Sequence, residues 1–116
     1  MRRIHTAPME LFSPKPNGNF ETEPHEAGWA SEAIAMVYVN SLAGPAPTLR
    51  IRVQISADGA RWMDLGREFE SISQIGGYHL GLEKFGNWLR LAGEVSGGPE
   101  DGEPAFEVDI YWVLKE

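Results

Sequence analysis

The residues of this 116-residue chain that could do chemistry together are carboxylates in its C-terminal third. Glu94, Glu107 and Asp109 are candidates for the two acids that flank a scissile bond in glycoside hydrolases. Glu107 and Asp109 stand two positions apart in an alternating segment, which places both on its outward face. We expect them to form cross-strand ion pairs with Arg50 and Arg52 instead. Because a Gly-x-Ser-x-Gly nucleophile motif is also missing, the sequence predicts a protein that is not an enzyme.

Residues that could bind a metal are scattered along the chain. His5, His25 and His79 have none of the His-x-His, His-x-x-x-His or Glu-x-x-His spacings of metal sites. The acidic segment 97–104 has oxygen ligands but lacks the EF-hand spacing, so we expect a solvated loop. The chain has no cysteine, which excludes thiolate-bound zinc, iron–sulfur clusters and a thiol nucleophile. We therefore expect no metal and no cofactor.

The net charge narrows the range of partners. It is formally −7, from 17 Asp and Glu against 10 Lys and Arg, whereas a nucleic-acid-binding protein needs a basic surface to neutralise phosphates. An anionic membrane surface repels an acidic chain for the same reason. Arg2 and Arg3 could begin a signal peptide, but Pro8, Glu10 and Pro14 interrupt any apolar stretch after them. We expect no nucleic acid, no membrane and no signal peptide, and a location in the cytoplasm or in a virion-like assembly.

Proline spacing divides the chain into two parts. Residues 1–28 hold four of the eight prolines, which excludes a helix and predicts an extended Pro-rich N-terminal arm with one or two short edge strands. Residues 29–116 are predicted to form the folded β-sandwich domain. Their length suits one domain that buries its own core.

Alternating residues predict strands throughout this domain. Residues 49–56 alternate between apolar and polar, Asp58-Gly59 predicts a tight hairpin turn, and a short return strand is expected to end at Gly66. Residues 33–39 are apolar on both faces and predict a buried strand. Further strands are predicted over 69–74, 78–82, 88–95 and 106–115, with a turn at Gly76-Gly77. The predicted fold is all-β: an antiparallel, jelly-roll-like β-sandwich of seven or eight strands that follows the extended arm.

Several of these segments resemble known families. The run LRIRVQISADGARW (49–62) resembles the VQxSxDGxxW strand and turn of discoidin-like (coagulation factor 5/8 C-type) domains. It is equally similar to small jelly-roll β-sandwich proteins of tailed-phage structural type. The run FGNWLRL (85–91) is similar to the strand that follows the central turn in both groups. The run EVSGG (94–98), followed after a loop by FEV (106–108), is similar to the ending of the phage-type proteins. The resemblance covers about 49–114; it implies a jelly-roll fold and carries over no catalytic residue.

Apolar and aromatic side chains are the candidates for contact with a partner. The predicted interface residues are Met9, Leu11, Phe12, Phe20, Trp88 and Tyr111. We expect a non-enzymatic structural or assembly protein, associated with a capsid, tail or shell, that self-associates through strand-face aromatics and its N-terminal arm. The arm packs either on its own domain or on a neighbour. The alternative is a carbohydrate- or ligand-binding β-sandwich module with Trp62 and Tyr78 on its rim; otherwise Trp62 is expected to cap the core, as Trp112 is expected to lie in it.

Overall fold

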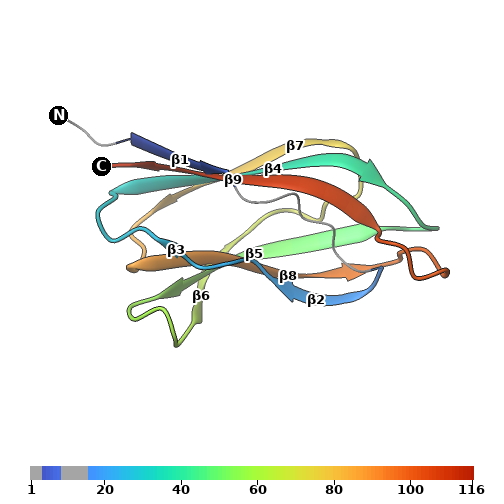
Figure 1. Ribbon diagram of the computed structural model, residues 1–116, viewed down its shortest axis with the longest axis horizontal. Helices are drawn as coiled ribbons and strands as arrows, with labels where there is room; N and C mark the ends of the chain where they lie inside the picture. Colours follow the sequence, from blue (N-terminus) through green and yellow to red (C-terminus); the bar gives the residue numbers. More distant parts are fainter. Residues whose placement is uncertain (1–3, 9–15) are drawn as a thin grey trace.

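Two antiparallel sheets face each other in the computed structural model, which describes residues 4–8 and 16–116 (Figure 1). Sheet A has the order β1-β9-β4-β7, and sheet B has the order β2-β8-β5-β6, with β3 also paired to β8. The strands of sheet A are β1 (Ile4–Pro8), β9 (Phe106–Lys115), β4 (Glu32–Leu42) and β7 (Gly76–Glu83). Those of sheet B are β2 (Gly18–Glu21), β3 (His25–Glu26), β8 (Trp88–Ser96), β5 (Thr48–Ser56) and β6 (Met63–Glu68).

This order confirms the predicted all-β antiparallel sandwich. Chain neighbours such as β4 and β5 lie in opposite sheets, and distant segments such as β4 and β9 pair, which is the connectivity of a jelly roll. The described residues form nine strands rather than the seven or eight predicted. Within them, the structure has no helix long and apolar enough to cross a membrane.

The core lies between the two sheets, as the alternating pattern predicts. In β9 the buried side chains are Phe106, Val108, Ile110, Trp112 and Leu114, while the residues between them are only partly buried or exposed. Trp112 is fully buried, as expected. The buried hydrophobic residues of the other long strands are Ala33, Ala35, Val37, Val39, Leu49, Ile51, Val53, Leu82, Leu89, Leu91, Ala92 and Val95.

Strand β4 is buried on one face only. The expectation of a strand buried on both faces is wrong for its outward residues: Tyr38 is 44% exposed, and Ile34 and Met36 are half-buried. The reason is the position of β4 in sheet A. One face packs on sheet B, and the other is the outer surface of a two-layer sandwich.

The turn between β5 and β6 is the predicted Asp-Gly turn. Gly59 has a φ of +79°, a conformation that glycine adopts without a steric penalty. The backbone N–H groups of Asp58 and Gly59 donate to Ser56 Oγ, at 3.2 and 2.8 Å. The N–H groups of Arg61 and Ala60 donate to the Asp58 carboxylate and hold its pKa well below its usual range. A short sequence signal is therefore enough to specify this hairpin.

Three predicted boundaries between 60 and 80 are wrong. Strand β6 continues through Gly66 to Glu68, because Gly66 (φ +87°) lies in a bulge opposite β5 rather than at a strand end. Residues 69–74 form no regular strand: Phe69 and Ile72 are both buried, and Ile72 forms an isolated bridge with Leu49. Gly76 and Gly77 begin β7 rather than form a turn, because they pair with β4.

The first 28 residues contribute backbone to both sheets. β1 pairs with β9 along the edge of sheet A, from Ile4 opposite Lys115 to Pro8 opposite Tyr111. β2 and β3 pair with β8 in sheet B. The described parts of the predicted arm therefore run along the sandwich as short edge strands.

Candidate functional site

The outer surface of sheet A carries a group of aromatic and apolar side chains over its two central strands. In the pairing of β4 with β9, Met36 lies opposite Tyr111 and Ile34 opposite Val113. The ring of Tyr38 meets the ring of Tyr111 edge to face, with centroids 5.8 Å apart and planes at 85°. We call this surface, made of Ile34, Met36, Tyr38, Tyr111 and Val113, the aromatic face.

A shallow hollow opens in the aromatic face. Its volume is about 410 Å³, and its lining is Thr6, Met36, Tyr38, Asn40, Asp109, Tyr111 and Val113. At one end the Asn40 amide Nδ2 donates a hydrogen bond to Asp109 Oδ2, at 3.0 Å. Beside it the ring of Tyr38 leans over β7, where a Cβ on Gly77 would stand 3.6 Å from the ring. The hollow thus combines two phenol rings with an amide–carboxylate pair.

The outer surface of sheet B has a different chemistry. Arg90 Nη1 pairs with Glu21 Oε2 at 2.6 Å, Arg90 Nε donates to Gln54 Oε1 at 2.8 Å, and the guanidinium stands 4.3 Å from the centroid of the Trp62 ring. Asp64 accepts hydrogen bonds from Arg52 Nε and Gln54 Nε2. We call this surface, made of Glu21, Arg50, Arg52, Gln54, Trp62, Asp64, Arg90 and Glu94, the charged face.

The ion pairs of the charged face correct one expectation. Arg50 pairs with Glu94 at 4.0 Å and Arg52 with Asp64 at 3.2 Å, so neither pairs with Glu107 or Asp109 as predicted. The reason is the sheet order: β5 lies next to β8 and β6 in sheet B, while β9 belongs to sheet A. The carboxylate considered for catalysis on β9, Asp109, instead accepts the Asn40 amide.

Two of the three histidines come together where β1 meets β3. The rings of His5 and His25 stack with centroids 5.9 Å apart, and Trp29 meets His5 edge-on. Burial of His25 lowers its pKa, and the neighbouring His5 lowers it further, against the opposing effect of Glu26. Among the described residues, no group of three or more His, Asp and Glu side chains is placed to hold a metal ion. The stack therefore joins the two sheets at one end of the sandwich.

The predicted interface residues fall in different places. Met9, Leu11 and Phe12 lie outside the described residues. Phe20 on β2 is half-buried and packs against the core. Trp88 is half-buried beside the β5–β6 turn, where a Cβ on Gly59 would be 3.2 Å from its Cε2.

Of the three interface candidates that the structure describes, Tyr111 alone lines the hollow of the aromatic face. Its closest aromatic companion, Tyr38, was not singled out from the sequence, because the apolar run 33–39 predicted burial. The apolar run 33–39 could have indicated Tyr38, because a strand that is apolar on both faces has its second face either under another layer or on a surface that binds a partner.

The two residues of the predicted ligand rim lie apart: Trp62 directly precedes β6 of sheet B, and Tyr78 is in β7 of sheet A. Trp62 lies under Arg90 on the charged face, so the expectation that it caps the core is wrong. Tyr78 on β7 packs against the core, and its hydroxyl donates to the Gln74 carbonyl at 2.8 Å. A common role for the two in ligand binding stays a prediction.

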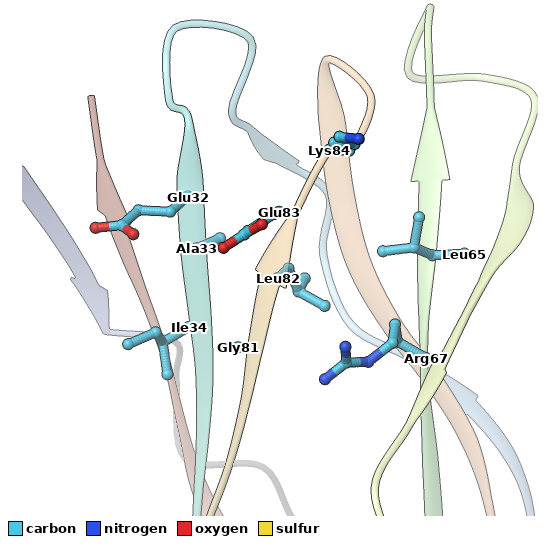
Figure 2. Close-up of a pocket in the computed structure, with 9 residues that line it drawn as sticks. All are labelled: Glu32, Ala33, Ile34, Leu65, Arg67, Gly81, Leu82, Glu83 and Lys84. Atoms are coloured by element: carbon cyan, nitrogen blue, oxygen red, sulfur yellow. The ribbon is translucent and has the colours of Figure 1, made fainter.

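A second hollow lies along the open side of the sandwich, between the edge strands β7 and β6. Its volume is about 720 Å³, and its lining is Glu32, Ala33, Ile34, Leu65, Arg67, Gly81, Leu82, Glu83 and Lys84. Figure 2 shows Leu82 and Arg67 pointing toward each other from the two strands, with Leu65 beside them. The two sheets are thus not closed along this side by backbone pairing.

Comparison with known proteins shows that the fold of this chain is similar to folds already solved. No protein-family model matches the chain, and no curated protein matches it. The chain is similar to a solved structure of infectious bursal disease virus, Gx strain, with TM-score 0.60 and 10% identity, over 100% of this chain and 32% of that one. The T13 particle of the same virus gives TM-score 0.57 and 12% identity, over 97% and 31% of the two chains.

A prophage-derived protein is similar over its whole length. The chain matches YomS of the SPBc2 prophage with TM-score 0.56 and 10% identity, over 100% of this chain and 96% of that one. It spans about a third of the bursal disease virus chains. At these identities the likeness shows the fold alone, an antiparallel jelly-roll-like β-sandwich.

Proposed function

We propose that this chain is a non-enzymatic structural protein that self-associates into a larger assembly through the aromatic face. The observation that carries the proposal is the half-exposed group of Met36, Tyr38 and Tyr111 over the centre of sheet A. Contiguous apolar surface of this kind gains free energy when a partner removes it from water, and tyrosine is enriched where proteins meet. In a two-layer sandwich the outer surface of sheet A is not covered by the described part of the chain, so this free energy is gained only when another molecule binds there.

The fold and the charge support this proposal. Two of the similar solved structures are of infectious bursal disease virus, one of them a viral particle, so this fold occurs in a protein that is part of an assembly. The net charge of −7 would keep free subunits soluble before they assemble. We include Met9, Leu11 and Phe12 in the proposal as further apolar contacts with a neighbour, and we propose a virion-like or cytoplasmic setting without nucleic acid as partner.

The test is the mass of the full chain in solution. We expect light scattering to give a multiple of 12.9 kDa that falls toward the monomer as the protein is diluted. Tyr38→Arg should dissociate the assembly, because it places a charge in the centre of the buried contact. The matched control is Met63→Arg, since Met63 is 67% exposed on β6, away from the aromatic face. A chain that stays monomeric at about 1 mM would overturn the proposal.

A carbohydrate-binding module is the second candidate, and one observation favours it. The hollow beside Tyr38 and Tyr111 offers phenol rings for stacking and the Asn40–Asp109 pair for hydrogen bonds to hydroxyl groups. A monomer whose melting temperature rises with an oligosaccharide, and loses that rise in Tyr111→Ser, would favour this candidate over assembly.

A further inference from the structure

Among the edge strands that the structure describes, β7 is long and has neither a proline nor a bulge, and its one carboxylate, Glu83, is its last residue. Sheet edges are normally kept from pairing by prolines, bulges, charges or short length. β6 has the bulge at Gly66, β2 has only four residues, and β1 ends in Pro8. β7 runs for eight residues with no proline and pairs with β4 in an unbroken register. Among residues 4–8 and 16–116, no strand other than β4 pairs with β7.

We propose that β7 pairs antiparallel with β7 of a second copy of this chain, about a two-fold axis at Leu80. The inference rests on the self-association proposed above and assigns one interface of it. The result is one continuous sheet of eight strands, with β1 at each end. Isologous pairing about a two-fold axis is the commonest way for a chain to form a dimer.

When two copies of β7 pair about Leu80, the outward residues of one copy fit those of the other. They are Gly77, His79, Gly81 and Glu83. In the proposed register Glu83 lies opposite the partner's Gly77, and His79 lies opposite the partner's Gly81. Each outward side chain thus meets a residue without one, and no two like charges are opposed.

The chain's own packing does not require these glycines. A Cβ on Gly81 would meet nothing within 4 Å, and one on Gly77 would make only an ordinary contact with the Tyr38 ring at 3.6 Å. Neither has the positive φ that favours glycine at other positions of the chain. Glycine inside a strand weakens it, and it often marks a place where another backbone approaches closely. A neighbouring β7 strand is such an approach.

The inward side of β7 agrees with the same register. Leu80 would lie against the partner's Leu80, and Tyr78 against the partner's Leu82. Leu80 is half-buried on the open side of the sandwich, while Leu82 is buried beside the hollow shown in Figure 2. Pairing would cover the exposed part of Leu80 with apolar surface, which is favourable.

The dimer would also extend the aromatic face. Sheet pairing about an axis normal to the sheet places the outer surfaces of the two copies side by side. Tyr38 lies next to Gly77, so the partner's Glu83 would border the aromatic face of each copy. The assembly surface proposed above would then be presented twice on one continuous sheet.

A pair of engineered cysteines tests the register directly, because the chain has none of its own. In His79→Cys/Gly81→Cys, each new thiol faces the other thiol of the partner, and mild oxidation should give a covalent dimer of twice 12.9 kDa. The controls are His79→Cys alone and Gly81→Cys alone, in which each thiol faces a residue without sulfur. Equal cross-linking of the double variant and the single variants would overturn the register.

Charge at Gly77 provides a second test. Gly77→Glu opposes two carboxylates twice in the dimer and should weaken it about tenfold, whereas Gly77→Lys should tighten it. The matched controls are Gly81→Glu and Gly81→Lys, which change the net charge equally but face His79. A difference between Glu and Lys that is as large at Gly81 as at Gly77 would overturn the inference.

The outcomes separate this inference from the proposed function. If Tyr38→Arg dissociates the assembly but the cysteine pair does not cross-link, the edge pairing is wrong and the aromatic-face proposal stands. If the cysteine pair cross-links while Tyr38→Arg leaves the mass unchanged, the edge pairing stands and the aromatic-face proposal is wrong. A chain that is monomeric at about 1 mM overturns both.

Discussion

The side chains on the two outer surfaces of the sandwich differ in how far they are bound by other residues of the chain. On the charged face, Arg90, Gln54 and Asp64 bind one another and their neighbours within the chain. On the aromatic face, the rings of Tyr38 and Tyr111 contact each other edge to face, and both remain partly exposed. Under the proposed function the two surfaces have different roles: the charged face stabilises the folded chain, and the aromatic face binds a partner.

The largest effect should come from breaking the charged face at Arg90. Its side chain is only 16% exposed, and it joins Glu21, Gln54 and the Trp62 ring. Arg90→Ala should lower the free energy of unfolding by about 2 kcal/mol, because Glu21 and Gln54 lose their donor and the Trp62 ring loses its cation together. Urea denaturation measures this. Arg50→Ala removes an exposed pair and should cost less than about 0.5 kcal/mol; equal losses would show that the network adds nothing.

The next effect should appear in assembly rather than in folding. Tyr38→Ser with Tyr111→Ser should raise the dissociation constant of the assembly at least about tenfold, or roughly 1.4 kcal/mol. The free energy of unfolding of the dilute monomer should change by about 1 kcal/mol or less, because both rings are partly exposed. Sedimentation equilibrium and urea denaturation measure the two quantities. A large loss of folding stability with unchanged association would reverse the roles assigned to the faces.

Salt should separate the two faces further. At about 1 M NaCl the Debye length is about 3 Å, so the ion pairs of the charged face weaken and the free energy of unfolding falls by up to about 1 kcal/mol. Association through the aromatic face should stay the same or strengthen, since repulsion between acidic chains is screened. Thermal unfolding and light scattering across a salt series give both values. Dissociation by salt would instead indicate an interface held by ion pairs.

The smallest effect concerns Asp64 at low pH. Hydrogen bonds from Gln54 and then Arg52 hold the pKa of Asp64 below its ordinary value of 3.8. The folded state therefore binds this proton less readily than the unfolded state, so the stabilisation is present above pH 3.8 and is lost as the pH falls through the lower folded value. Asp64→Asn should flatten the melting temperature over that range, and Glu100→Gln in the acidic loop should not. If Asp64→Asn has the same pH dependence of the melting temperature as the unchanged chain, Asp64 does not contribute to the stability that the charged face provides.

Short-range patterns accounted for much of the fold. The alternation over 106–115 predicts the buried row of β9, and that over 49–56 predicts β5, because each pattern has the period of a strand. Asp58-Gly59 predicts a hairpin because few residues adopt the required backbone angles. The bulge at Gly66 was missed, since an isolated glycine marks a strand end and a bulge equally well.

The sequence by itself determined the fold class, the main core rows and the absence of cysteine chemistry, because these depend on composition and local period. Which charges pair was decided by the tertiary structure, since Arg50 and Arg52 meet the carboxylates of β8 and β6 only once the sheet order is set. The same holds for the aromatic face. The sequence around Tyr38 would look the same whether a third layer covered it or it lay on an open surface. The structure has two layers, and Tyr38 lies on the outer surface of one of them.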